Sequence, residues 1–323
     1  MRPFGRARGR RTRLFFATDL HGSERCFRKW LNAASVYEVD ALLLGGDIAG
    51  KTFVAIVEDP PGEYAATLNG RLERAAGTPG LGELEQRVRA AGHYPLTVTP
   101  DEQVRLTSDR SVREHAMREA MVRQLELWTA LADERLEVPA YAILGNDDPP
   151  ELADVLRASE RLAFAEDGLM ELPGGYPMAS FGFSTPTPWN TPRELSDEKI
   201  ATHIDQLLSA VDDPQRAVWN FHCPPHETHL DKAPMLDADL RPIVGPSGAE
   251  SASVGSASIR DAVLREQPLL TLHGHVHESA AMQRLGVTTC INPGSEYGQG
   301  ILRGALVELE PDRGVTTWQL IQG

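Results

Sequence analysis

Five short apolar runs in this chain each end in a polar cluster, and this pattern constrains the fold more than any other feature. The clusters are Asp19-Leu20-His21 after residues 14–17, Gly46-Asp47 after 41–44, Gly145-Asn146-Asp147-Asp148 after 141–144, His222 after 217–221, and His273-Gly274-His275-Val276-His277 after 269–272. Strands that alternate with polar loops and helices indicate an α/β fold. Ligands bind beyond the carboxyl ends of strands in such sheets, so we expect these clusters to meet at one site.

The rest of the chain fits a single domain over residues 1–323 that carries one long insertion. A helix is expected from Ser23 to Ala34 with Ser23 as its N-cap, and a second from Ile259 to Glu266. The stretch from Pro234 to Ser258 is rich in Ser, Gly and Ala and is expected to be a loop. The C-terminal third predicts consecutive strands at residues 282–291, 304–309 and 316–321.

Residues 51–138 are too many for a simple crossover between two strands, so we interpret them as a compact α/β insertion that partly covers the site. Turns are expected at 59–62 and 77–80, and a helix at 112–137 that begins with a capping box of Ser111 and Glu114. One face of this helix carries Met121, Leu125, Trp128 and Ala132 at helical spacing. We interpret that stripe as core, with a partner surface as the alternative.

The overall charge narrows the choice of partners. The formal net charge is −14 and the pI is about 5.2, which disfavours binding to a nucleic-acid polymer or an acidic membrane surface. A phosphate ester stays possible as substrate, because bound dications can reverse the local field. No stretch is long and apolar enough for a membrane span.

The N-terminal residues 1–13 include six arginines, as the basic start of a signal peptide does. The apolar run that follows, at 14–17, is far too short for one. We therefore expect a solvated, disordered basic tail, with a polyanion-binding arm as the alternative.

Three widely spaced cysteines, Cys26, Cys223 and Cys290, are no disulfide framework and fit a reducing cytoplasm. Cys223 adjoins His222, which leaves two interpretations: a metal ligand or reactive thiol, and a small apolar residue that packs beside the site. The packing interpretation is favoured because structural thiols are usually buried and inert.

The donor types in the clusters suit particular metals. Carboxylate, carboxamide and imidazole groups together fit borderline first-row dications such as Mn, Fe or Zn. One carboxylate can bridge two ions held roughly 3.5–4 Å apart, the two-metal arrangement of phosphoryl chemistry. The five clusters supply enough donors for two such ions.

The motif order D-x-H, G-D, G-N-D, H, G-H-x-H resembles the calcineurin-like metallophosphoesterase superfamily, and within it the predicted phosphoesterases related to the Icc cyclic-nucleotide phosphodiesterase. Further segments that support this branch are Ser184-Thr185-Pro186-Thr187-Pro188-Trp189-Asn190, His222-Cys223-Pro224-Pro225 with Leu230-Asp231, and Asn292-Pro293-Gly294-Ser295. The resemblance runs from about Arg13 to the C-terminus and excludes most of the insertion. It implies a four-layer α+β sandwich, with two mixed sheets packed face to face and flanked by helices.

The resemblance also assigns roles to individual residues. Asp19, His21 and His277 would hold one metal, Asn146, His222 and His275 the other, and Asp47 would bridge them. A water or hydroxide between the ions would attack phosphorus. Asp147, Asn146 and His222 are the candidate catalytic residues. The other histidines are not expected to be ligands; His273 would support the site from behind, and the rest are His93, His115, His203, His226 and His229.

One position departs from the family pattern. Most relatives have His after the Gly-Asn pair, where this chain has Asp147. An ionised carboxylate there would repel a phosphate dianion, so Asp147 is either protonated, or orients an imidazole, or points away from the substrate. A singly charged diester tolerates the carboxylate better, which favours phosphodiesterase activity. Trp189 either stacks on a nucleotide base or packs within a Pro-flanked turn.

The sequence thus predicts a hydrolase that uses two divalent ions to cleave a small phosphate ester, with a nucleotide as one candidate. A phosphodiesterase is the leading interpretation. A phosphomonoesterase is the second, and a non-catalytic scaffold of the same fold is the third. The oligomeric state stays open.

Overall fold

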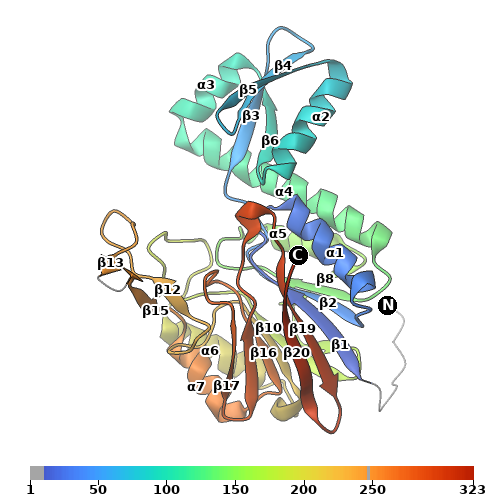
Figure 1. Cartoon of the computed structure of the whole chain (residues 1–323), viewed down its shortest axis with the longest axis vertical. Helices are drawn as coiled ribbons and strands as arrows, with labels where there is room; N and C mark the ends of the chain where they lie inside the picture. The colour runs from blue at the N-terminus through green and yellow to red at the C-terminus, as the bar shows by residue number, and fades with distance from the viewer. Residues whose placement is uncertain (1–10, 246–247) are drawn as a thin grey trace.

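Two six-stranded sheets pack face to face at the centre of the molecule (Figure 1). The computed structural model describes residues 11–245 and 248–323. The first sheet has the order β20-β19-β1-β2-β7-β8, with β1 (Thr12–Ala17), β2 (Ala41–Gly45), β7 (Ala140–Ile143), β8 (Leu162–Phe164), β19 (Arg303–Glu310) and β20 (Gly314–Gln322). The second has the order β17-β18-β16-β11-β10-β9, with β9 (Met170–Leu172), β10 (Tyr176–Phe181), β11 (Val218–Phe221), β16 (Leu270–Leu272), β17 (Ala281–Leu285) and β18 (Thr288–Asn292).

Both sheets are mixed, with a parallel centre. Strand β2 lies parallel between β1 and β7, with β8 parallel to β7 at the edge, and β16 lies parallel between β11 and β18. Antiparallel β19 and β20 extend the first sheet beyond β1, and antiparallel β17 and β9 are the two edges of the second. The carboxyl ends of the parallel strands therefore lie on one edge of each sheet, where the polar clusters follow.

Side chains that alternate along the strands build the layers. In β1, Leu14 and Phe16 join the core between the two sheets, whereas Phe15 and Ala17 join the core under the outer helices. The first sheet is covered by α1 (Glu24–Val36), α4 (Arg110–Arg135) and α5 (Leu152–Ala158), and the second by α6 (Asp197–Leu208) and α7 (Ala257–Glu266). Helices, sheet, sheet and helices form the four-layer sandwich that the sequence predicts.

Residues 53–108 form a separate lobe at one end of the sandwich (Figure 1). Its sheet has the order β5-β4-β3-β6, made of β3 (Phe53–Glu58), β4 (Glu63–Leu68), β5 (Arg71–Ala76) and β6 (Tyr94–Val98). Helices α2 (Gly77–Ala90) and α3 (Pro100–Ser108) complete it. Small apolar clusters of its own, around Ile56 and Leu84 and around Leu96 and Leu106, stabilise the lobe.

The helix that closes the insertion belongs mostly to the sandwich. Trp128 of α4 stacks on Phe27 of α1 with ring centroids 4.3 Å apart, and Leu125 and Ala132 lie in the same core. The core interpretation of the stripe is therefore confirmed. The separate lobe therefore covers only part of the expected 51–138 segment, because α4 packs mostly on the sandwich.

Several local predictions need correction. The capping box at Ser111 and Glu114 is wrong: Asp109 is the N-cap of α4, because its carboxylate accepts from the backbone N–H of Ser111 and Val112. The 77–80 segment is no turn but the first turn of α2, since Pro79 is tolerated in a first helical turn. Residues 282–291 form two strands, which turn at Gly286 with a φ of 62°.

Two further boundaries differ from the prediction. Strand β1 begins at Thr12, so the end of the expected tail belongs to the sheet, where Arg11 and Arg13 pair with Glu308 at 3.1 and 2.8 Å. The rest of that tail, residues 1–10, lies outside the described residues. The loop-rich stretch 234–258 contains short strand pairs, namely β12 (Lys232–Pro234) with β15 (Ser251–Ser253) and β13 (Val244–Gly245) with β14 (Gly248–Ala249). No helix within 11–245 and 248–323 combines the length and apolar character that crossing a bilayer requires.

Candidate metal centre

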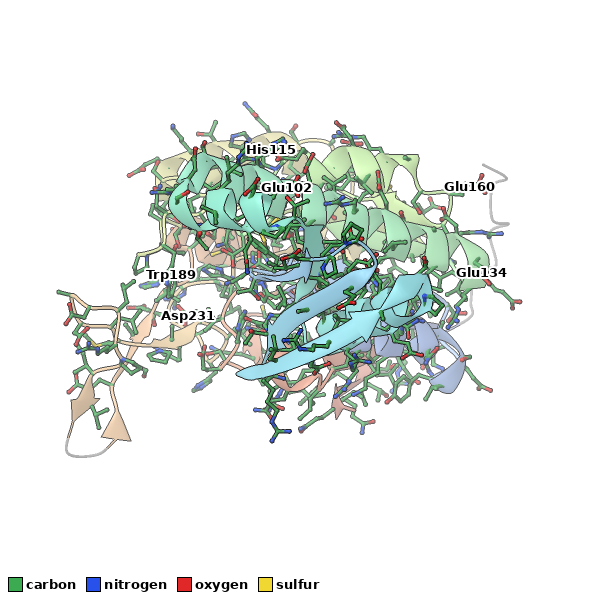
Figure 2. The ribbon with its side chains drawn as sticks, turned by 90° about the horizontal axis from the view of Figure 1, so that it is seen from above. Glu102, His115, Glu134, Glu160, Trp189 and Asp231 are labelled. Atoms are coloured by element: carbon green, nitrogen blue, oxygen red, sulfur yellow. The ribbon has the colours of Figure 1, made fainter. Side chains whose placement is uncertain are left out.

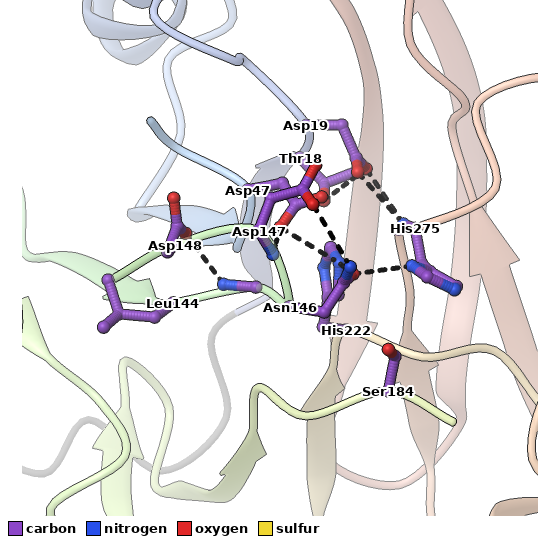
Figure 3. Close-up of polar contacts among 12 residues, drawn as sticks. Thr18, Asp19, Asp47, Leu144, Asn146, Asp147, Asp148, Ser184, His222 and His275 are labelled. Atoms are coloured by element: carbon purple, nitrogen blue, oxygen red, sulfur yellow. Dashed lines mark hydrogen bonds and ion pairs between the residues drawn. The ribbon is translucent and has the colours of Figure 1, made fainter. Parts of the chain in front are cut away.

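All seven predicted ligands lie close together where the carboxyl ends of the two sheets meet. Figure 3 shows five of them, Asp19, Asp47, Asn146, His222 and His275. Asp19 and His21 follow β1, Asp47 follows β2, and Asn146 follows β7. The second sheet supplies the remaining three from the loops after β11 and β16, namely His222, His275 and His277. We call these seven residues the metal centre.

One group of donors comes from both sheets. The Nε2 atoms of His21 and His277 lie 3.1 Å apart, and His277 Nε2 lies 3.3 Å from Asp19 Oδ1. These atoms can approach a common ion, because a carboxylate oxygen and two imidazole nitrogens within 4.8 Å of one another fit one coordination sphere.

A second group surrounds the carboxamide of Asn146. Its Oδ1 lies 3.0 Å from His222 Nε2 and 2.7 Å from His275 Nδ1. Two imidazoles and an amide oxygen are again a donor set for a first-row dication.

Asp47 lies between the two groups. Its Oδ2 is 3.6 Å from His21 Nε2, and its Oδ1 is 3.5 Å from His222 Nε2. Each carboxylate oxygen thus faces a different donor group, which is the arrangement that a bridging carboxylate needs.

The backbone at the metal centre is strained. Asp19, His21, Asp47 and His275 have φ values of 53°, 42°, 49° and 69°. This left-handed region is unfavourable for residues with a Cβ, and such residues cluster at functional sites. In this conformation the backbone turns sharply after each strand, and the side chains of neighbouring loops point to one place.

Two glycines permit this close approach. A Cβ on Gly145 would lie 2.1 Å from Asp47 Oδ1, and a Cβ on Gly274 would lie 2.4 Å from Asp19 Oδ2. Neither distance is possible for real atoms, so any larger residue would displace a carboxylate of the metal centre.

Asp148 supports the metal centre, a role that the sequence did not indicate. Its buried carboxylate accepts from the backbone N–H groups of Ile48, Ala49 and Gly145, at 3.0, 2.7 and 2.8 Å. It therefore ties the loop after β2 to the loop after β7. Burial and the nearby Asp47 raise the pKa of Asp148 to about 7, although the three N–H donors oppose this.

Neutral side chains orient other parts of the site. Asn146 Nδ2 donates to Thr191 Oγ1 at 2.9 Å, and Thr191 Oγ1 donates to Glu194 at 2.6 Å, which directs Asn146 Oδ1 toward the histidines. Asn292 Nδ2 contacts the carbonyl oxygens of Gly274 and Val276 at 3.3 and 3.0 Å. The Asn292-Pro293-Gly294-Ser295 segment was the only sequence signal for such support.

The pKa values show how the donors affect one another. Burial lowers the pKa of His21 to about 3, and burial with the nearby His222 lowers that of His275 to about 4, so both are neutral. Burial opposes charge on His222 as well, but the Asp47 carboxylate raises its pKa to about 10. Burial disfavours the Asp47 anion, yet His222 lowers the pKa of Asp47.

These donors fit a pair of metal ions. His21 Nδ1 is buried and has no hydrogen-bond partner within the described part of the chain. Two buried carboxylates, Asp19 and Asp47, lie close together; although burial opposes it, Asp47 raises the pKa of His222, and Asp19 raises the pKa of His277. A cation in each donor group would take over the balance of these negative charges.

Asp147 does not face the pocket as a lone carboxylate. Its Oδ2 forms an ion pair with Lys51 and lies 3.9 Å from His21 Nδ1. Its backbone N–H donates to Asp47 Oδ1 at 2.9 Å. Burial and Asp47 raise the pKa of Asp147, whereas Lys51 lowers it. The sequence did not single out Lys51.

A groove adjoins Asp147 on its other side. Its volume is about 470 Å³, and its apolar walls are Met117 and Met121 of α4 with Pro149, Pro150 and Pro192. The groove is also lined by three charged residues, Glu114, Arg118 and Glu151. The groove offers room for an organic group next to Asp147.

Other histidines contact other groups or face solvent. His273 is buried and supports the strand ends, with Nδ1 2.8 Å from Phe221 O and 3.0 Å from Cys223 O. His226 Nδ1 lies 3.6 Å from the buried Asp231. His115 is exposed on α4, far out on the surface in Figure 2. The described residues that group as metal donors include none of the five that were expected to be non-ligands, His93, His115, His203, His226 and His229.

The structure also decides between the two interpretations of Cys223 and of Trp189. Cys223 is buried in the core under α6 and α7, and burial raises the pKa of its thiol to about 12, so it packs as an inert side chain. Trp189 does not pack within its turn: its side chain is 63% exposed, at the periphery of the view in Figure 2. The packing interpretation of Trp189 is therefore wrong, and stacking on a base stays a prediction.

Comparisons with known proteins bear on the fold. No family model matches the chain. An uncharacterised protein of Methanocaldococcus jannaschii is 27% identical over 171 residues, which are 52% of this chain and 70% of that protein. One crystal structure has a TM-score of 0.58 at 16% identity and covers 97% of this chain and 99% of its own. That of TT1561 from Thermus thermophilus has a TM-score of 0.51 at 13% identity, covering 97% and 98%.

These likenesses show the fold alone: the two structures share with this chain an architecture in which two mixed sheets pack between helices. At such low identity they say nothing about which reaction this chain performs.

Proposed function

We propose that this protein is a metal-dependent phosphoesterase that uses two divalent ions, with Mn, Fe and Zn as the candidates. The position of Asp47 carries the proposal, since its two oxygens face different donor groups at 3.6 Å from His21 and 3.5 Å from His222. A carboxylate between two such groups suits the two-metal chemistry of phosphoryl transfer.

In this proposal Asp19, His21 and His277 would hold one ion, and Asn146, His222 and His275 would hold the other. Such ions would supply a hydroxide near neutral pH and would offset charge on the phosphoryl oxygens. Asn146 and His222 would then act in catalysis by binding a metal ion. His222 must first release the proton from Nε2, because only a neutral imidazole nitrogen is a ligand. Asp147 keeps its carboxylate paired with Lys51 at the rim.

The surroundings support a small phosphodiester as substrate. The groove that adjoins Asp147, lined by Met117 and Met121, has space for one organic substituent, and its apolar walls suit a flat ring such as a nucleobase. Asp147 beside the pocket disfavours a doubly charged monoester more than a singly charged diester. A nucleotide is thus one candidate. The three free, buried cysteines support a cytoplasmic location.

The full-length protein, reconstituted in turn with Mn, Fe or Zn, should hydrolyse bis(p-nitrophenyl) phosphate more efficiently than p-nitrophenyl phosphate. Chelation should abolish this activity, and added metal should restore it. His275→Ala should lose activity, whereas His115→Ala, which removes an exposed histidine of α4, should keep it.

Higher kcat/KM on the monoester would favour the phosphomonoesterase instead. Protein that binds metal yet hydrolyses neither ester with any of the three ions would contradict the proposal and favour a non-catalytic scaffold.

A further inference from the structure

We propose that Lys51 binds the phosphoryl oxygens of the substrate and that Asp147 positions it, an inference that rests on the proposed function. Asp147 alone occupies the position after the Gly-Asn pair, and Lys51 reaches it from the loop after β2. Lys51 would donate to an oxygen of the phosphoryl group that bears negative charge. Asp147 would act through Lys51 and not touch the substrate.

The backbone before Lys51 is fixed to the metal centre. Lys51 lies four residues after Asp47, and the intervening loop donates two N–H groups to Asp148. The next N–H, of Gly50, donates to the hydroxyl of Tyr94 at 2.5 Å. The Lys51 side chain therefore begins from a rigid loop and not from the surface of the lobe.

The side chain returns toward the metal centre. Its ammonium contacts Asp147 Oδ2, and that carboxylate lies 3.9 Å from His21 Nδ1. The backbone N–H of Asp147 in turn donates to Asp47 Oδ1 at 2.9 Å. The Tyr297 ring also packs near His21, with ring centroids 4.5 Å apart. Lys51 is thus connected to the metal donors through a single carboxylate, that of Asp147.

The ammonium keeps donors for an incoming anion. Lys51 has three N–H donors, and Asp147 is its only ion-pair partner within residues 11–245 and 248–323. The Lys51 side chain is 51% exposed, whereas Asp147 is only 16% exposed. A phosphate would therefore meet the ammonium first, with the carboxylate behind it.

Charge explains why the two residues act together. A lone carboxylate beside the pocket would repel any phosphate, and an unpaired lysine on a long side chain would move freely. Paired, they present a positioned ammonium whose charge is partly balanced by Asp147. Such a group matches a single negative charge better than two, which agrees with a diester substrate.

The test uses the full-length, Mn-loaded protein and the variants Lys51→Ala, Lys51→Arg and Asp147→Asn. Lys199→Ala is the matched control, because it removes the same charge from the exposed face of α6. The measurements are metal content, kcat and KM for bis(p-nitrophenyl) phosphate, and the dissociation constant of inorganic phosphate by calorimetry.

We expect Lys51→Ala to weaken phosphate binding and raise KM about 10- to 100-fold, with metal content unchanged. Lys51→Arg should recover most of the loss, and Lys199→Ala should behave as wild type. Asp147→Asn should raise the ratio of monoester to diester kcat/KM by about tenfold, because one negative charge leaves the rim.

Unchanged phosphate binding and KM in Lys51→Ala would overturn the inference even if the wild type is active. An unchanged ester ratio in Asp147→Asn would remove Asp147 from this role. If the wild type hydrolyses no ester, the proposed function fails, but the calorimetry still decides whether Lys51 binds phosphate.

Discussion

The two sheets of the sandwich bring different donors to the same pocket. Loops after the first sheet supply the oxygen ligands Asp19, Asp47 and Asn146, whereas loops after the second supply the imidazoles of His222, His275 and His277. The exception is His21, which follows β1 and faces His277 across the interface at 3.1 Å. Neither sheet alone can complete a donor group.

We call the loops after the first sheet the first side and the loops after the second sheet the second side. Different groups hold the two sides in place. A third carboxylate, that of Asp148, ties together the first-sheet loops, and it lies close to Asp47. Neutral groups hold the second-sheet loops, with Asn292 bonded to Gly274 O and His273 bonded to Phe221 O. Metal binding should therefore relieve charge repulsion between the carboxylates of the first-sheet loops, whereas in the second-sheet loops it must displace the proton of His222.

The largest effect is expected from the carboxylate shared by both groups. Asp47→Asn removes a buried charge from between His21 and His222, so both ions should be bound more weakly. We expect kcat/KM to fall by about 10²–10³-fold or more, with a loss of metal measured by elemental analysis. Asp312→Asn, the same change at an exposed turn, is the control.

If Asp47→Asn kept both ions and most of its activity, the first sheet would not supply the shared ligand. The comparison between the two sheets would then rest on Asp19 as the carboxylate donor of the first sheet.

The second side can be tested through pH, using the metal-free protein. Burial lowers the pKa of His273 from 6.5 to about 4. Because the folded state disfavours the proton, this contribution to stability is complete above pH 6.5 and is lost as the pH falls from 6.5 toward 4. The free energy of unfolding should fall by about 3 kcal/mol over that range on account of His273.

Urea unfolding in the presence of chelator at several pH values between 6.5 and 4 measures this. His273→Gln should show a smaller acid loss than wild type, although His21 and His275 still contribute in the same direction. Equal acid losses in the two proteins would show that His273 is not kept neutral by burial.

The contact between loops of the first side is tested by Gly145→Ala. The added methyl would overlap Asp47 Oδ1, at 2.1 Å, and must displace it. Displaced ligands typically cost 10- to 100-fold in metal affinity, so we expect a loss of about this size in titrations with Mn. Gly82→Ala in α2, where no atom lies within 4 Å of the new Cβ, should leave metal affinity unchanged.

Wild-type affinity in Gly145→Ala would mean that the loops after β2 and β7 can separate without moving Asp47. The first side would then be less rigid than the second.

The sequence predicted that these side chains meet because each is local to a recognisable strand end. Asp19, Asp47 and His222 all follow buried runs, and strand ends in such folds meet at one edge. The supporting residues were not predictable in this way. Lys51, Asp148 and Thr191 act through contacts that depend on where distant loops lie, and their residue types are common in ordinary loops.

The structure of the lobe was also only partly predictable from the sequence. Its strands β4 and β5 expose much of their surface, so their apolar patterns are weak, and the 77–80 segment reads as a turn although it begins α2. The long helix was predictable because its stripe packs on Trp30 and Phe27, but its start was not, since Ser111 and Asp109 compete as N-caps. Local preference decides such ends only when no neighbouring residue offers a better cap.

The smallest effect is expected at Thr191, which is not itself one of the seven predicted ligands. Its hydroxyl accepts from Asn146 Nδ2 and donates to Glu194, which keeps the carboxamide oxygen directed at His222 and His275. Thr191→Val removes the hydroxyl at nearly constant shape, so the carboxamide can rotate. Metal affinity should fall about tenfold, whereas Thr191→Ser should retain it. Equal affinities for the two variants would show that the imidazoles of the second sheet alone orient Asn146, so that the oxygen donors depend on the nitrogen donors for their geometry.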